Sequence, residues 1–151
     1  MKLLIGIVLF SVISVSGCAL HKAPEVAVKT DPEFQAADRF VNEKQYTEAA
    51  AAYDKIAKES PATERGANAL FAAAATHAYY ENPRKDYLKA FQLFDEFLKS
   101  YPASDKFRDA QNWRAVLKTV LELKKENDRL NKSIEQLKKI DIRHEERRKG
   151  K

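Results

Sequence analysis

The chain has 151 residues, a net charge of +5, one cysteine, three histidines and four glycines. Only Gly66 and Gly150 lie beyond the N-terminal apolar segment, which excludes a glycine-rich loop of the kind that cradles phosphate. The histidines at positions 21, 77 and 144 are scattered, so we expect no metal site, no cofactor and no enzymatic activity.

Residues 1–17 are predicted to be a signal peptide. Lys2 supplies a positive charge, and the apolar residues 3–15 are too few for a membrane-spanning helix, which needs about 20. The sequence Val15-Ser16-Gly17-Cys18 then resembles the lipobox of bacterial lipoproteins. This resemblance implies that the Cys18 thiol is acylated and that Cys18 is the first residue of the mature chain. The alternative is a secreted protein with an incidental cysteine.

The residues after the lipobox indicate where the chain is anchored. Several acyl chains on one residue give stable membrane binding, which a single chain does not. Ala19, rather than Asp, follows Cys18, and the lipoprotein sorting rule of Gram-negative bacteria then favours the outer membrane, facing the periplasm. Residues 18–30 contain Pro24 and no helical stripe, and we expect them to form a tether.

The first helix is predicted to begin after the tether. Asp31 suits the N-cap and Pro32 the first helical position. Residues 42–45 are the expected turn into the second helix. The buried stripe of the first helix is predicted to be Ala37, Phe40 and Val41.

One segment occurs twice, at residues 46–61 and 87–102. Each copy has a Tyr, an Ala, an aromatic residue and an apolar residue at steps of three, four and three, followed by Pro. These steps place the residues on one helix face, which we expect to be buried, and Pro ends the helix. The repeat step is 41 residues, typical of a helix pair. The matched residues are Tyr46/Tyr87, Ala49/Ala90, Tyr53/Phe94, Ile56/Phe97 and Pro61/Pro102.

At these residues the chain resembles a tetratricopeptide repeat (TPR), whose second helix begins Tyr-x-x-Ala and ends in Pro. The resemblance covers residues 31–117 and implies an all-α solenoid of about two and a half stacked helix pairs. Ser104 is predicted to cap a fifth helix that covers the last pair through Phe107, Ala110, Trp113 and Leu117. Before it, the inner helix of the second pair is predicted to end ahead of Asn82-Pro83, and Asp86 is predicted to cap the helix that begins at Tyr87. Its core-facing residues are predicted to be Ala67, Leu70, Phe71, Ala74, His77 and Ala78.

The fifth helix is predicted to continue beyond the repeats, because no Gly or Pro occurs from Phe107 to Arg148. Residues 118–142 have a heptad pattern with β-branched residues at position a, Leu at d and one Asn at a, which a parallel two-stranded coiled coil favours. The predicted seam is Val120, Leu123, Asn127, Leu130, Ile134 and Leu137. A parallel homodimer through residues 120–137 is one interpretation. A helix of another protein, or a solitary solvated helix, are the alternatives.

Residues 143–151 form a basic tail, suited to anionic lipid or an acidic partner, or simply a frayed, solvated end. The net charge of +5 does not indicate a nucleic-acid partner. Lys and Arg alternate with Glu and Asp along the predicted helix faces, the pattern of a solvated surface. The export signal also argues against nucleic acid, and we expect no such partner.

Two lipoprotein families share features with this chain. The charged, apolar-periodic residues 123–149 resemble QseG-type lipoproteins, which work beside a membrane sensor kinase. The lipobox followed by helix pairs resembles BamD-type lipoproteins of the outer-membrane β-barrel assembly machinery, although those have about five repeats.

These resemblances imply a non-catalytic adaptor of the bacterial envelope. An accessory factor in outer-membrane protein assembly or in cell-wall or division machinery, or a purely structural spacer, are the alternatives. A partner peptide or helix would lie against the inner helices of the solenoid. The candidate contacts are Phe71, His77, Tyr79, Tyr80 and Arg84.

Overall fold

The computed structural model describes residues 31–150, and within that range the chain is all-α, with no strand. The all-α prediction is therefore confirmed for this part of the chain. The predicted signal peptide (1–17), the acylated Cys18 and the tether (18–30) lie outside the described residues. The helices are α1 (Pro32–Asn42), α2 (Tyr46–Glu59), α3 (Glu64–Ala78), α4 (Tyr87–Ser100) and α5 (Phe107–Lys149).

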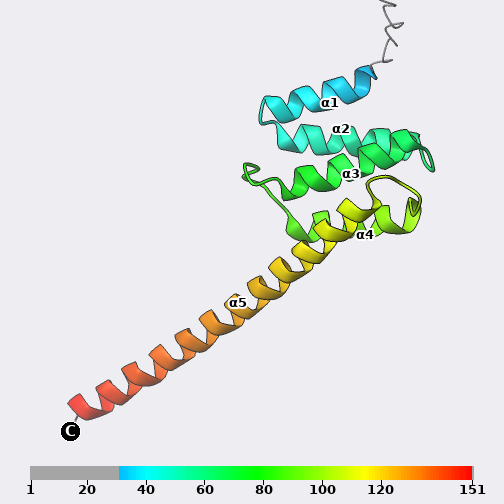
Figure 1. Ribbon diagram of the computed structural model, residues 1–151. Coiled ribbons are helices and arrows are strands. Elements are labelled where there is room, and N and C mark those ends of the chain that lie inside the picture. Colours follow the sequence, from blue (N-terminus) through cyan, green and yellow to red (C-terminus); the bar gives the residue numbers. More distant parts are fainter. Residues whose placement is uncertain (1–30, 151) are drawn as a thin grey trace, which may run out of the picture.

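Helices α1 to α4 lie side by side in chain order, whereas α5 begins beside α4 and then projects away from the other four as a rod (Figure 1). Each helix packs against its neighbour in sequence, from α1 on α2 to α4 on α5. At 1.5 Å per residue the 43 residues of α5 make a rod of about 65 Å. The predicted basic tail is not frayed in the structure. It is helical as far as Lys149, because the run without Gly or Pro continues to that residue.

The repeated segment forms two equivalent helices, α2 and α4, of 14 residues each. Both begin at the repeated Tyr and end two residues before the repeated Pro. The repeated Ala, aromatic and apolar residues are buried in both helices, so the predicted stripe is confirmed. The small Ala lets the neighbouring helix approach, and the larger side chains fill the space beyond it. The buried pairs are Ala49/Ala90, Tyr53/Phe94 and Ile56/Phe97.

The aromatic position of the repeat differs between its two copies for a chemical reason. In α4, Phe94 is fully buried between Phe71 of α3 and Trp113 of α5, with ring centroids 5.3 Å and 6.0 Å away. In α2, the ring of Tyr53 packs against Phe34 of α1, and its hydroxyl donates a hydrogen bond to the Asp38 carboxylate. Burial, together with this bond, raises the pKa of Tyr53. A hydroxyl can be accommodated in α2 because an acceptor lies nearby.

Two of the predicted helix starts are confirmed. The Asp31 carboxylate caps α1 by accepting hydrogen bonds from the backbone N–H groups of Glu33 and Phe34, at 3.0 and 3.3 Å. Asp86 caps α4 by accepting from the N–H of Lys89 at 2.9 Å. Each carboxylate satisfies amides that have no partner within the helix.

The predicted cap of the fifth helix is wrong. Helix α5 begins at Phe107, and Lys106 occupies the N-cap position without a side-chain cap. Ser104 instead holds the preceding turn: its hydroxyl accepts from the N–H of Lys106 at 3.2 Å, and its carbonyl accepts from the N–H of Phe107 at 3.1 Å. Because both oxygens of Ser104 are used in this turn, the helix begins at Phe107, two residues later than a cap at Ser104 predicts.

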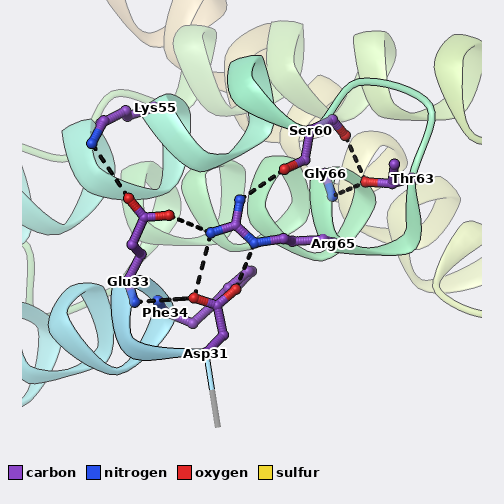
Figure 2. Close-up of polar contacts among 8 residues, drawn as sticks. All are labelled: Asp31, Glu33, Phe34, Lys55, Ser60, Thr63, Arg65 and Gly66. Carbon is purple, nitrogen blue, oxygen red and sulfur yellow. Dashed lines mark hydrogen bonds and ion pairs between the residues drawn. The ribbon is translucent and has the colours of Figure 1, made fainter. Parts of the chain in front are cut away.

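Arg65, in the first turn of α3, ties the start of α1 to the end of α2 (Figure 2). Its guanidinium donates to Asp31 at 2.6 Å, to the Ser60 hydroxyl at 2.7 Å and to Glu33. Lys55 of α2 reaches Glu33 from the other side, at 3.4 Å. One planar group with several donors thus joins three segments, a geometry for which Arg is suited and Lys is not.

Candidate interaction surfaces

Phe71, one of the predicted contacts, borders a groove between α3 and α5. Its ring packs on Phe94 and Phe97 of α4, while the rest of the side chain remains partly accessible. The groove has a volume of about 590 Å³ and is mostly apolar. It is lined by Phe71, Asp109, Asn112, Trp113 and Val116.

His77 and Arg84 border a different groove, of about 390 Å³, between α2 and α4. Its floor is made of small residues, Ala50 and Ala73, and its rim carries charges of both signs, including Asp86 and Lys89. His77 is half-buried in the last turn of α3, and burial lowers its pKa. The groove therefore presents a neutral imidazole beside charged groups and can accept a polar segment of another chain. This groove shares no lining residue with the groove at Phe71, so the predicted contacts Phe71 and His77 border different grooves.

Tyr79, Tyr80 and Arg84 lie in the loop 79–86, and the prediction that they belong to an inner helix is wrong. Helix α3 ends at Ala78, four residues before Asn82. The buried Asn82 side chain donates to the carbonyl of Thr76 at 3.0 Å, which fixes the loop against the helix end. This side-chain bond replaces the next helical hydrogen bond, so the helix stops earlier than the position of Pro83 indicates.

The two loop tyrosines form an aromatic cluster with the first residue of α2. The Tyr79 ring lies 5.4 Å from that of Tyr46 and 5.1 Å from that of Tyr80, measured between centroids. Glu81 accepts hydrogen bonds from the hydroxyls of Tyr46 and Tyr80 at 3.1 and 2.9 Å, and Lys44 lies 3.3 Å away. These bonds lower the pKa of Glu81, which therefore stays ionised. Tyr80 is 73% exposed and is the most accessible ring of the cluster, while Tyr79 is 39% exposed.

The predicted seam of α5 is a line of exposed apolar side chains on the projecting rod. Leu123 is 65% exposed and Leu137 is 61% exposed, values that are unusual for leucines spaced along one helix face. Leu130 and Ile134 are about half exposed, Asn127 is exposed and Val120 is partly buried. The structure thus places all six predicted seam residues on one accessible stripe.

The stripe begins earlier in the chain than the predicted seam. Trp113 and Val116 precede Val120 at the same alternating steps of four and three, and they are 41% and 55% exposed. Trp113 covers the last helix pair, as expected, by stacking on Phe94, but much of its ring is accessible. Extending the heptad pattern by one period would have found both residues. The apolar stripe is defined hereafter as Trp113, Val116, Val120, Leu123, Asn127, Leu130, Ile134 and Leu137.

Several charged residues beside the stripe are paired within α5 or with α4. Glu126 accepts from Arg129 at 2.6 and 2.8 Å, and Lys138 lies 2.9 Å from Glu135. Nearer the other helices, Arg114 donates to Asp95 of α4 at 2.7 Å and so fixes the rotation of α5. These surface pairs add little stability, and they leave the apolar stripe uncovered.

Within residues 31–150, no group of three or more His, Cys, Asp and Glu side chains is placed to bind a metal ion. Among the five described helices, none combines the length and the apolar character needed to cross a membrane. Comparison with protein-family models, with curated proteins and with solved structures finds no match to this chain. The candidate sites are therefore the apolar stripe, the groove at His77 and the tyrosine cluster.

Proposed function

We propose that the chain is a lipid-anchored, TPR-like adaptor of the bacterial outer membrane, which faces the periplasm and acts by binding other proteins. Its acyl chains on Cys18 hold it to the membrane, and residues 19–30 link them to the helical domain. Residues 123–149 resemble QseG-type lipoproteins, and this resemblance implies that the partner is a membrane sensor kinase.

The observation that carries this proposal is the apolar stripe on a helix that projects from the rest of the chain. Residues 122–150 are exposed apart from Ser133, and the main packing partner of α5 within the described residues is α4. Exposed apolar side chains in a continuous line mark a surface that another protein covers. Two equivalent helices, α2 and α4, with the same buried positions support the TPR-like assignment.

Photo-crosslinking in living cells tests the binding and the anchoring together. A photoreactive side chain at Leu130 should give protein adducts, because Leu130 lies on the apolar stripe. The matched control is Lys125, which is also exposed but lies on the far side of α5, and it should give none. Both the chain and its adducts should sediment with outer membranes.

Two variants test the anchor in the same cells. Cys18→Ser should release the chain into the soluble fraction, whereas Ala19→Asp should keep it acylated but, in a Gram-negative host, move it to the inner membrane. An unacylated wild-type chain, or a Cys18→Ser chain that stays with the membrane, would rule out the lipoprotein assignment. Equal adducts from Leu130 and Lys125 would rule out the stripe as the binding surface.

A further inference from the structure

We infer that the apolar stripe is covered by α5 of a second copy of this chain, in a parallel, in-register pair whose contact begins inside the helical domain at Trp113. This inference rests on the proposed binding role of α5 and names the partner. It extends the predicted seam of residues 120–137 by one heptad toward the domain. The stripe then runs from Trp113 to Leu137, over about 36 Å of helix.

The domain leaves room for a second helix at this end. Ala110 and Leu117, the buried residues of α5, face α4. Trp113 and Val116 lie roughly a quarter turn away around the helix, beside the groove at Phe71. The groove of about 590 Å³ is open at Val116, so a second helix can lie against it without displacing α4.

The pattern of the stripe favours a parallel pair of identical helices. With the chains in register, Asn127 faces Asn127 of the second copy, and the two amides can hydrogen-bond to each other. In the antiparallel arrangement that fully overlaps the stripe from Trp113 to Leu137, Asn127 faces Leu123, which buries an amide against an apolar side chain. Within one chain, Asn127 accepts only from Asn131 of the next turn, at 2.8 Å, so its amide group is free to pair.

The charges beside the stripe permit this pairing. In a parallel pair, Thr119 faces Lys124, Glu126 faces Asn131, and Ser133 faces Lys138 of the other helix. None of these pairs brings like charges together. A helix that lies on a membrane surface would instead need a broad apolar face opposite a basic one. The stripe of α5 is narrow and has acidic and basic residues on its flanks.

The area of the stripe is sufficient for a dimer. Side chains of this size and exposure present roughly 600 Å² per copy, so two copies bury about 1,200 Å², near the lower limit for a stable interface. Without Trp113 and Val116 the area would fall below that limit. The contact at the domain therefore adds area that residues 120–137 alone do not provide. It also fixes the two domains relative to each other and leaves both grooves at His77 free.

Variants of the full-length chain with one added cysteine, oxidised mildly in native membranes, test the pairing. Val116→Cys and Leu123→Cys should each give a disulfide-linked dimer in most of the chain, because parallel helices in register bring identical positions together. Ala115→Cys, on the exposed side of the same turn, should give at least about tenfold less dimer. Val116 is 55% exposed and is not part of the buried core, so its substitution should leave the domain folded.

The outcomes separate this inference from the proposed function. If Leu123→Cys gives a dimer but Val116→Cys does not, the contact at the domain is ruled out. If neither variant gives a dimer, a second copy of the chain does not cover the stripe. If neither dimerises while the photoreactive Leu130 variant yields heavier adducts, α5 binds a different protein and the adaptor role stands. If the wild-type chain itself forms a disulfide, Cys18 is not acylated and the anchor fails. The pairing is then judged with Cys18→Ser as the background.

Discussion

Gly66 determines how closely α3 approaches the end of α2. A Cβ atom at this position would lie 2.0 Å from the Ser60 carbonyl oxygen and 2.8 Å from the Tyr101 hydroxyl. The Ser60 carbonyl oxygen belongs to the backbone, so it cannot move aside without shifting the chain. A glycine near the start of a helix normally indicates only low helix propensity, so its packing role could not be predicted from the sequence.

Gly66→Ala should therefore destabilise the protein by about 2 kcal/mol or more, because overpacking outweighs the gain of about 1 kcal/mol in helix propensity. Urea denaturation of the variant and of the wild type measures the difference. Gly150→Ala is the control, since a Cβ atom there meets only the Glu146 carbonyl at 3.6 Å, and it should leave stability unchanged. Equal stability of Gly66→Ala and wild type would show that α3 does not approach Ser60 this closely.

Two further residues adopt backbone conformations that the sequence did not indicate. Lys44 and Ala62 have φ values of 61° and 56°, in the left-handed region that favours glycine. Each stands in the short turn that follows a helix, after α1 and after α2. Non-glycine residues are tolerated there because the packed helices on either side fix the path of the chain.

The joint between α1, α2 and α3 depends on Arg65, and its contribution should depend on pH. Hydrogen bonds from Arg65 lower the pKa of Asp31 and of Glu33 below their usual values of 3.8 and 4.5. When the pKa of a carboxyl group is lower in the folded chain than in the unfolded chain, the group stabilises the folded chain at any pH above its unfolded pKa. This stabilisation is lost as the pH falls through the pKa of the folded chain.

Arg65→Gln should therefore lower the melting temperature by several degrees at pH 6, and the difference from wild type should shrink as the pH falls from 5 to 3. Circular dichroism at a series of pH values measures it. Arg129→Gln is the control, because its partner Glu126 also has a lowered pKa but the pair lies exposed on α5. A difference between Arg65→Gln and wild type that stays constant from pH 6 to pH 3 would contradict the role of the two carboxylates.

Local sequence patterns predicted the helices well where the signal lies within one helix. The repeated Tyr, Ala and aromatic residues, the caps Asp31 and Asp86 and the Pro-limited ends of α2 and α4 all follow from short-range rules. The failures lie at helix ends, where a loop side chain forms a hydrogen bond that the helical pattern does not reveal. Asn82 ends α3 early by bonding to Thr76, and Ser104 holds a turn instead of capping a helix.

The candidate surfaces could be predicted only in part. Heptad spacing identified the exposed side chains of α5, because periodicity on one helix is visible in sequence. It did not show that Trp113 remains half accessible after stacking on Phe94, since that depends on how α4 and α5 cross. The separation of Phe71 and His77 into different grooves likewise depends on how α3 sits between its neighbours.

The described residues form a packed body of short helices and a rod, α5, whose residues from 122 onward are almost all exposed. Helices α1 to α4 bury most of the core, whereas α5 buries only Ala110 and Leu117. A helix without tertiary contacts is marginally stable in water, and its ion pairs add only a few tenths of a kcal/mol each. We therefore expect another helix to cover the distal half of α5 in the native protein.

Amide hydrogen exchange along α5 of the full-length, acylated chain tests this expectation most directly. If the apolar stripe is an interface, amides of residues 123–137 should exchange roughly 100-fold or more slowly than in an unstructured peptide. Leu130→Glu should abolish that protection while leaving α2 to α4 protected. Exchange of residues 123–137 at peptide rates in the wild-type chain, with α2 to α4 protected, would contradict the account.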